Sequence, residues 1–516
     1  MEPPVPPGPV PPGPVPPSTA PPPSPAASIP PPMRPIPGRP QYRPVPCFLV
    51  RARADRRLVI GALAGGILFD VAVHSGVATV AVTGWLAVIA AAMLLGGRVR
   101  GIVSKVLLAA VPVIGLLFAL RSSPWVIVPV SLAELLLLFL GVSLGADGGG
   151  VAQTFPALIN RFSLVIGHLV VAPGMFRFTA EAGRDDMVQK RAAAVVRGVL
   201  LGLPVMIVVG LLLATADPIF RSWFDLGPLL EHLAVVLAGA WVVVGLARAA
   251  SARDPSPAAP PAPSLGTVEV SFVLGGLCAL YGAFVAAQFV ALSGAGHRIL
   301  VTHGLTYAQY ARGGFFHLLA CAAITLVVLL GVRACSDKTR LIPASFAGLT
   351  TALTLGVVFV AIRRLQLYEA AYGLTMLRLA SLVAAIWIGV VFVLLAMTIV
   401  PRALPARLFP AAMIASGLVL VGAWGISNPA SIVATIDLHR AEHGHRLDVR
   451  QAVRLGPDAM PALVAGLPHL DVAADLALRR AICARSAEKD AGTAFNLARA
   501  MAAHAISQAC RKSGFS

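Results

Sequence analysis

The residue with the strongest potential for chemistry is a glutamate inside an apolar stretch. Glu134 lies near the centre of the segment Trp125 to Leu144. An isolated ionised carboxylate at the bilayer centre costs at least about 2.5 kcal/mol, so this group must be neutral, paired or hydrated. Pro129 frees the backbone carbonyl of Trp125, and a broken helix beside a buried acid resembles the ion or proton sites of transporters. The alternative is a neutral glutamate that makes one hydrogen bond between helices.

Tyrosine and arginine recur together in two other segments, which hold four of the six tyrosines. The first segment is THGLTYAQYARGGFFHL and the second is RRLQLYEAAYGLTMLRL. The residues of interest are Tyr307, Tyr310 and Arg312 in the first, and Arg364, Tyr368, Glu369, Tyr372 and Arg378 in the second. Spacings of three and four residues place each tyrosine pair on one face of a helix. The arginines indicate an anionic headgroup or ligand, and the alternative is an aromatic belt with snorkelling arginines.

Other polar residues have a weaker case for function. Asp70 and the pair Glu231-His232 lie near the ends of apolar segments, where they can be hydrated without serving a function. His439 and His443 are four residues apart on an expected helix, with His445 close by, so they are weak candidates for zinc ligands. Because zinc needs three or four converging ligands, we favour a solvated polar face and expect no metal or other cofactor.

Membrane helices must position these residues. Hydrophobic residues make up 57% of the 516 residues, charged residues make up 12%, and the mean hydropathy is +0.82. Soluble domains have about 25% charged residues. A helix needs about 20 apolar residues to span a bilayer, because lipid offers no hydrogen-bond partner to the backbone. The composition therefore predicts an all-α polytopic bundle in a lipid bilayer.

Eleven segments between Leu58 and Trp424 have about this length. They are Leu58 to Val73, Val77 to Leu95, Ile102 to Leu120, Trp125 to Leu144, Gly198 to Ala214, Leu229 to Leu246, Val268 to Leu292, Gly314 to Val332, Leu341 to Ile362, Leu377 to Val400, and Leu408 to Trp424. If the N-terminus is cytoplasmic, the cytoplasmic loops hold most of the Lys and Arg residues, as the positive-inside rule requires. This predicts a cell-membrane protein with a cytoplasmic N-terminus and an extracytoplasmic C-terminus. Residues 157–173 include Arg161 and His168, and we expect them to be interfacial, because another span there would invert the loops that follow.

The segments divide the chain into five regions. The first 46 residues hold about half of the 43 prolines, which predicts a disordered spacer; a docking ligand for a protein partner is the alternative. The regions are a Pro-rich cytoplasmic tail (1–57), a first membrane block of six spans (58–249), a Pro/Ala linker (250–266), a second membrane block of five spans (267–425), and a helical extracytoplasmic tail (426–516). No signal peptide is expected, because the first apolar run lacks a cleavage site.

Charge and cysteine content restrict the partners. The formal net charge of +18 is explained by cytoplasmic loops against an anionic leaflet, and no nucleic-acid-binding motif is present, so we expect no nucleic-acid partner. The excess of Arg over Lys and the abundance of Ala indicate a GC-rich bacterial genome. The six cysteines have no metal-binding spacing. Cys483 and Cys510 both fall in the region expected outside the cell, where they can be free or form a disulfide.

Several strings of residues resemble a known family. They are YAQYARGGFF, LYEAAYGLTMLRL, ADPIF at Ala216 to Phe220, and the tail NPASIVATIDLHRAEHGHRLDVRQAVRLGPDAMPAL. The chain after Arg161 is similar to a bacterial multi-pass membrane family catalogued as a domain of unknown function of the 4153/4173 type. The resemblance implies a helical bundle with a C-terminal helical tail, and no activity. It marks Tyr307, Tyr310, Arg312, Tyr368, Tyr372 and Arg378 as motif positions, whereas the tail histidines depart from the pattern of the relatives.

The sequence favours an integral membrane protein that transports or binds a small or lipid-like anionic ligand. This interpretation rests on Glu134 beside Pro129 and on the two Tyr/Arg segments. A non-catalytic envelope scaffold or sensor that engages protein partners is the alternative. An enzyme is disfavoured, because the chain lacks HExxH, GxSxG and kinase motifs, and a transferase that uses Asp217 or Asp225 would have no paired acid and base.

Overall fold

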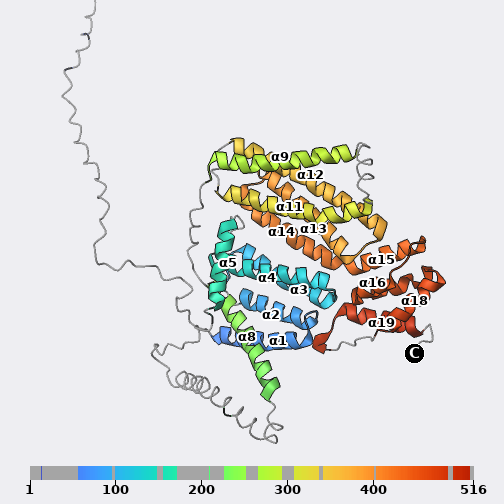
Figure 1. Cartoon of the computed structure of the whole chain (residues 1–516). Coiled ribbons are helices and arrows are strands. Elements are labelled where there is room, and N and C mark those ends of the chain that lie inside the picture. Colours follow the sequence, from blue (N-terminus) through green and yellow to red (C-terminus); the bar gives the residue numbers. More distant parts are fainter. Residues whose placement is uncertain are drawn as a thin grey trace, which may run out of the picture. The chain divides into compact units, whose positions relative to one another are not determined.

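The computed structural model describes residues 56–95, 99–147, 155–170, 226–251, 265–292, 307–335, 341–399, 403–485 and 492–511, together with the single residues 8, 13, 172 and 209. These residues form helices and no β-strand (Figure 1). The α-helices are α1 (Arg56–Ser75), α2 (Val80–Leu95), α3 (Ile102–Leu120), α4 (Pro124–Asp147), α5 (Phe155–Val170), α8 (Leu226–Ser251), α9 (Thr267–Leu292), α11 (Tyr307–Cys335), α12 (Leu341–Tyr372), α13 (Met376–Met397), α14 (Phe409–Ser427), α15 (Pro429–Glu442), α16 (Val449–Arg454), α17 (Met460–Gly466), α18 (Val472–Cys483) and α19 (Leu497–Arg511). Short 3-10 helices are η3 (Ala406–Leu408), η4 (Pro457–Ala459), η5 (Leu467–His469) and η6 (Gly492–Ala494).

Eight of the described helices are long and apolar enough to cross a membrane. They are Ile102–Leu120, Pro124–Gly145, Glu231–Ala250, Thr267–Gln288, Phe315–Arg333, Ala344–Ala370, Met376–Met397 and Ala406–Ser427. Each matches one of the eleven expected spans. Two further expected spans correspond to shorter apolar helices, Val59–Ser75 and Val80–Leu95, and the span expected at Gly198 to Ala214 lies outside the described residues. The prediction of an all-α polytopic bundle is confirmed, and the chain is a membrane protein.

The first cluster of buried apolar residues contains side chains from α1, α2, α3, α4, α5 and α8. Glycines let α1 and α8 approach closely. A Cβ atom on Gly66 would lie 2.4 Å from the carbonyl oxygen of Val236, and one on Gly239 would lie 2.5 Å from the Cβ of Phe69. A Cβ atom on Gly61 would meet no atom within 4 Å. The close backbone contact therefore lies around the middle of α1.

A second cluster joins α9, α11, α12, α13 and the start of α14. Phe409 of α14 belongs to this cluster, whereas Leu418 and Trp424 further along α14 pack against the first one. The helix α14 thus contacts both groups of membrane helices. The buried residues of the first cluster end at Ala250 and those of the second begin at Val270, close to the limits of the expected linker 250–266, and the domain boundaries themselves stay predictions.

The tail helices α15 to α19 form a third cluster, which also contains Leu374 and Met376 from the junction of α12 and α13. Side-chain caps begin three tail helices, since Asn428, Asp448 and Asp471 each accept a backbone N–H hydrogen bond from the residue three positions later. A disulfide between Cys483 and Cys510 joins α18 to α19, with a Cα–Cα distance of 5.8 Å. Of the two alternatives for these cysteines, the structure has the paired one.

Polar contacts attach the tail to one end of the membrane helices. The backbone N–H of Val80 donates to the carbonyl of Phe495 at 3.0 Å, and the fully buried Asn496 amide donates to the carbonyls of Phe118 and Arg121 at 3.0 and 2.9 Å. Arg121 in turn donates to the carbonyl of Gly425 at 2.8 Å. These bonds lie at the start of α2 and the ends of α3 and α14. The tail therefore docks on helix ends that the sequence predicts to be extracytoplasmic.

Candidate functional site

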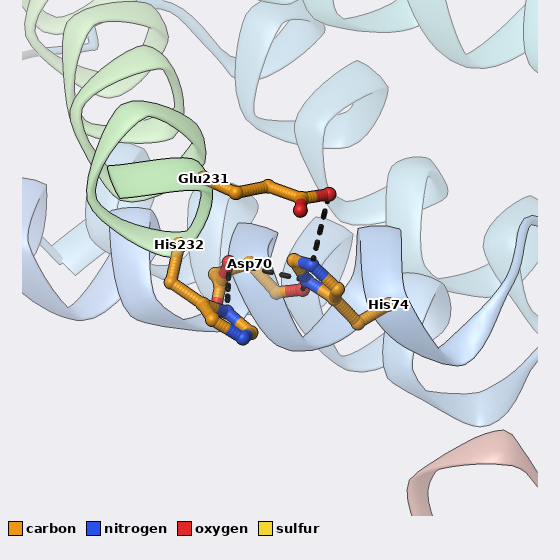
Figure 2. Close-up of polar contacts among 4 residues, drawn as sticks. All are labelled: Asp70, His74, Glu231 and His232. Atoms are coloured by element: carbon orange, nitrogen blue, oxygen red, sulfur yellow. Dashed lines mark hydrogen bonds and ion pairs between the residues drawn. The ribbon is translucent and has the colours of Figure 1, made fainter. Parts of the chain in front are cut away.

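Two helix ends bring four ionisable side chains together (Figure 2). Asp70 and His74 lie in the last turns of α1, and Glu231 and His232 lie in the second turn of α8. The Nδ1 atom of His232 lies 2.9 and 2.8 Å from the two carboxylate oxygens of Asp70. The Nδ1 atom of His74 lies 3.2 Å from Asp70 Oδ1, and its Nε2 atom lies 3.7 Å from Glu231 Oε1. The Asp70 carboxylate is therefore shared by two imidazoles from different helices.

Exposure decreases toward the centre of this cluster. The Asp70 side chain is 16% exposed, compared with 34% for His74, 49% for His232 and 69% for Glu231. The two imidazole rings lie against each other with their centroids 4.1 Å apart. The cluster offers imidazole nitrogens and carboxylate oxygens within a few ångströms, which suits either a cation or a network of hydrogen bonds.

From the sequence, Asp70 and Glu231-His232 are expected to be hydrated residues near helix ends, and nothing singles out His74. Asp70 and His232 are 162 residues apart, so only the pairing of α1 with α8 brings them together. The i, i+4 spacing of Asp70 and His74 was the one local signal, because it places both side chains on the same helix face.

Glu134 lies inside the first cluster, on the face of α4 that packs against α3. It is 3% exposed, and neither carboxylate oxygen has a hydrogen-bond partner among the described residues. A Cβ atom on Gly115 of α3 would lie 3.5 Å from Glu134 Oε1 and 3.2 Å from the Leu86 side chain. The Gly115 carbonyl already accepts a 2.7 Å hydrogen bond from the hydroxyl of Thr83. The alternative of a glutamate with one interhelical hydrogen bond is absent from this arrangement.

The expected helix break beside Glu134 was wrong. α4 continues from Pro124 to Asp147 with Pro129 inside it. The carbonyl of Trp125 that this proline leaves free accepts a 2.9 Å hydrogen bond from the indole N–H of Trp424 on α14. A helix-to-helix bond satisfies the carbonyl, as is common where proline interrupts a membrane helix. The proline in α4 therefore leaves a carbonyl that links α4 to α14.

The second Tyr/Arg segment is compact in the structure. The Arg378 guanidinium carbon lies 4.2 Å from the centre of the Tyr368 ring, and the rings of Tyr368 and Tyr372 are 5.0 Å apart. Arg378 also donates to the carbonyls of Tyr372 and Gly373 at 3.3 and 2.5 Å, which caps the C-terminal end of α12. The Oε1 atom of Glu369 is buried and has no hydrogen-bond partner among the described residues. Four of the predicted site residues are thus brought together around one helix end.

The other predicted residues of the two segments are placed less directly. Arg364 donates a 3.2 Å hydrogen bond to Gln288 on α9. Tyr307, Tyr310 and Arg312 lie in the first turns of α11, and their side chains are outside the described part of the chain. Phe315, in the next turn, packs in a cluster with Leu365 and Tyr368 of α12. The start of α11 therefore approaches the second segment.

The tail lies against the same loop. Asp437 accepts a 3.2 Å hydrogen bond from the backbone N–H of Leu374, and Arg440 donates to the carbonyl of Ala370 at 3.0 Å. Burial raises the pKa of Asp437, although the Leu374 hydrogen bond and the charges of Arg440 and Arg378 act in the opposite direction. The chain between α12 and α13 is therefore held by polar contacts from the tail.

Asp458 is a second anchor of the tail. Its side chain accepts hydrogen bonds from the backbone N–H and the hydroxyl of Ser122, at 2.9 and 2.7 Å. Ser122 lies between α3 and α4, so this carboxylate bonds the tail to the membrane helices and leaves the helix start to Pro457.

The tail histidines form only a partial group. His439, Glu442 and His443 offer ligand atoms within 4.8 Å of one another, and all three are exposed. The His439 Nδ1 atom lies 3.2 Å from Glu442 Oε2, and His443 Nδ1 lies 2.8 Å from the carbonyl oxygen of His439. His445 is not part of this group. Asp217 and Asp225 lie outside the described residues.

Comparison with known proteins places the chain in a family. A family model described as a domain of unknown function (DUF4153) matches residues 106–466, which is more than half of the chain. The chain therefore belongs to this family, and the resemblance seen in its sequence is confirmed. The comparisons with curated proteins and with solved structures gave no match.

Proposed function

We propose that this DUF4153 protein transports a small or lipid-like anionic ligand across the bacterial cell membrane, and that proton exchange at Glu134 is part of the cycle. The observation that carries the proposal is the burial of Glu134 with no hydrogen-bond partner among the described residues. An ionised carboxylate in this position costs at least about 2.5 kcal/mol, so the closed bundle favours a neutral carboxyl group. A conformation that admits water to Glu134 would favour the charged form. A residue of this kind can couple a change of conformation to a proton.

We assign ligand recognition to the start of α11, the end of α12 and the start of α13. Arg378 has guanidinium donors beyond the Nη1 group that caps α12, and Tyr368 lies against its plane. Arg312 begins the neighbouring helix α11. Two arginines beside tyrosine rings are suited to a phosphate or carboxylate group attached to an apolar body.

The topology proposed for this activity has the N-terminus in the cytoplasm and the tail outside. The distribution of Lys and Arg supports it. So does the disulfide between Cys483 and Cys510, because disulfides persist in oxidising compartments. The contact of His232 with Asp70 adds support, since it places the start of α8 at the same end as the end of α1. Between these two points α2, α3, α4 and the expected span Gly198 to Ala214 make four crossings, which return the chain to the same side. A further crossing by α5 would put the start of α8 on the opposite side, so we propose that α5 does not cross.

Native mass spectrometry of the full chain, purified in mild detergent, tests the ligand assignment. Wild type is expected to retain an anionic lipid or metabolite, and Arg378→Gln and Arg312→Gln are each expected to retain less of it. Arg363→Gln is the matched control, because Arg363 is an exposed neighbour whose described bond is to Gln366. Equal retention in all four proteins would contradict the assignment.

A second experiment tests the transport step with the ligand so identified. In vesicles that contain the purified protein, ligand uptake should depend on a pH gradient, and Glu134→Gln should abolish this dependence while ligand retention stays unchanged. If uptake is the same with and without a pH gradient, and the same in wild type and Glu134→Gln, then Glu134 takes no part in the mechanism.

A scaffold or sensor is the second candidate, and a feature of the tail favours it. A groove of about 480 Å³ lies between α17 and α19 and is lined by Pro461, Val464, Ala465, Ala500, Met501, His504, Ala505 and Gln508. Its mixed apolar and polar lining is suited to a peptide segment of a partner. If this candidate is correct, a specific protein should co-purify with wild type and be lost with Met501→Glu, and Glu134→Gln should have no effect.

A further inference from the structure

We propose that Asp70, His74 and His232 bind a Zn²⁺ ion, with Glu231 at the rim of the site. This site is separate from the Glu134 and Tyr/Arg groups, so the inference stands independently of the proposed transport. Figure 2 shows the four side chains converging from α1 and α8.

The donor set has the chemistry that zinc prefers. Zinc is bound in proteins by imidazole nitrogen and carboxylate oxygen, and sites with three protein ligands keep a fourth position for water or another ligand. Two histidines and one aspartate fit this pattern, whereas Ca²⁺ and Mg²⁺ prefer sites made of oxygen ligands. Glu231 is mostly exposed and its Oε1 lies 3.7 Å from His74 Nε2, so it can supply the fourth ligand or orient that imidazole.

The spacing of the ligand atoms is compatible with one ion. Asp70, His74 and His232 each offer a ligand atom, and these atoms lie within 4.8 Å of one another. With zinc–ligand distances of about 2.0–2.2 Å, the ligand atoms of a tetrahedral site are roughly 3.3 Å apart. Small rotations of the side chains on fixed backbones cover the difference.

The helix backbones beneath the site are closely packed. Gly66 and Gly239 allow α1 and α8 to touch within two turns of the cluster, and a Cβ atom at either position would collide with the opposite helix. The hydroxyl of Ser75, next to His74, donates to Thr493 of the tail at 2.9 Å. The ligands thus come from two helices held at a fixed distance, and ion binding needs no ordering of a loop. Preorganised ligands of this kind favour binding.

The side chains of the cluster can either bind zinc or form hydrogen bonds with one another. Without an ion, His232 Nδ1 lies 2.8 Å from the Asp70 carboxylate, and His74 Nδ1 lies 2.9 Å from the backbone carbonyl oxygen of Asp70 and 3.2 Å from its Oδ1. The same carboxylate would keep one imidazole correctly oriented while the ion enters, as carboxylates do beside zinc-bound histidines. The tail offers a comparison, since His439 and His443 are an exposed histidine pair at the C-terminal end of α15.

Zinc binding to the full chain tests the proposal. The purified protein, freed of metal with a chelator and held in nanodiscs of neutral lipid, is titrated with Zn²⁺ against a chromophoric chelator. Wild type is expected to bind one ion tightly, and His74→Gln combined with His232→Gln is expected to bind at least about tenfold more weakly. The matched control, His439→Gln combined with His443→Gln, should bind like wild type. Ca²⁺ and Mg²⁺ should not compete.

X-ray absorption at the zinc edge provides a second measurement that does not depend on the folding of the cluster variant. One equivalent of Zn²⁺ on wild type and on the His439/His443 control should give two imidazole ligands at about 2.0–2.1 Å, with oxygen as the remaining ligand. The absence of tight binding to wild type would overturn the proposal. Loss of the imidazole signal in the His439/His443 control would also overturn it, because the ion would then be on the tail.

Discussion

Two carboxyl groups in this protein, those of the half-buried Asp437 and the buried Glu134, have opposite surroundings. Asp437 accepts a backbone hydrogen bond from Leu374 and lies near two arginines. Glu134 has no hydrogen-bond partner among the described residues, and its Oε1 lies 3.5 Å from where a Cβ atom on Gly115 of α3 would be. A satisfied carboxylate stabilises a contact, whereas an unsatisfied one costs free energy. Asp437 therefore serves to dock the tail. Glu134 does not stabilise the fold, so we infer that its role is functional.

The stability contributed by Asp437 should depend on pH. Because its folded-state pKa is raised by burial, the folded protein binds this proton more tightly than the unfolded chain does. The contribution is complete below the ordinary value of 3.8 and is lost as the pH rises through the raised pKa. Asp437→Asn keeps an oxygen acceptor for Leu374 and does not titrate. The melting temperature of wild type minus that of Asp437→Asn should therefore fall as the pH rises above the ordinary value of 3.8.

Thermal unfolding in detergent at several pH values measures this difference. Ser431→Ala, a tail variant without a titrating group, is a suitable control for general effects of pH on the detergent. A rise in the relative stability of wild type with pH would mean that the arginines outweigh burial, and the account of Asp437 would be wrong.

At the scale of the elements, the pairing of α1 with α8 determines where the histidine cluster forms. Hydropathy predicted both helices, because a membrane helix must be long and apolar to satisfy its own backbone. It could not predict their contact, since the glycines that allow it, Gly66 and Gly239, are far apart in the sequence and glycine is common in membrane helices. For the same reason Asp70 and His232 could be described singly from the sequence but not as one site. The contact of Trp424 with Trp125 is another long-range feature without a local signal.

Substitution of one glycine should test the α1–α8 contact. Gly66→Ala places a methyl group 2.4 Å from the carbonyl oxygen of Val236, so the helices must separate. We expect a loss of roughly 1–3 kcal/mol in the free energy of unfolding. Gly61→Ala, one turn earlier on the same helix, meets no atom within 4 Å and should be neutral or gain up to about 1 kcal/mol from helix propensity. Equal effects of the two substitutions would mean that α1 does not pack on α8 as described.

At the scale of the whole molecule, the tail joins helices from both membrane clusters. Asp458 binds Ser122 before α4, and Arg440 binds the end of α12. The sequence predicted tail helices from their caps and apolar pattern, but not these contacts, because single polar residues in loops give no indication of their partners. The tail thus connects the α1 end beside the histidine cluster with the α12–α13 loop beside the Tyr/Arg residues, at one end of the membrane bundle.

Removal of the disulfide can be used to test both the stability of the tail and its location outside the cell. Replacing Cys483 and Cys510 together by serine should lower the free energy of unfolding of the tail by about 2–4 kcal/mol, because the closed loop of 27 residues restricts the unfolded chain. Protease digestion of the tail in whole cells should be faster in the variant than in wild type. Alkylation of Cys483 or Cys510 in the wild type without reductant would contradict a disulfide, and resistance of both proteins to added protease would contradict an outside tail.

The protonation state of Glu134 tests the central claim most directly. Infrared difference spectroscopy of the full chain in lipid at neutral pH compares wild type with Glu134→Gln, and Glu369→Gln serves as the control for the other buried glutamate with an unpartnered oxygen among the described residues. Our account predicts that wild type has the C=O stretch of a protonated carboxyl group, that Glu134→Gln loses this band, and that Glu369→Gln keeps it. A spectrum in which Glu134→Gln instead loses only the bands of an ionised carboxylate would mean that Glu134 is charged in the closed bundle, and the proposed proton exchange would be wrong.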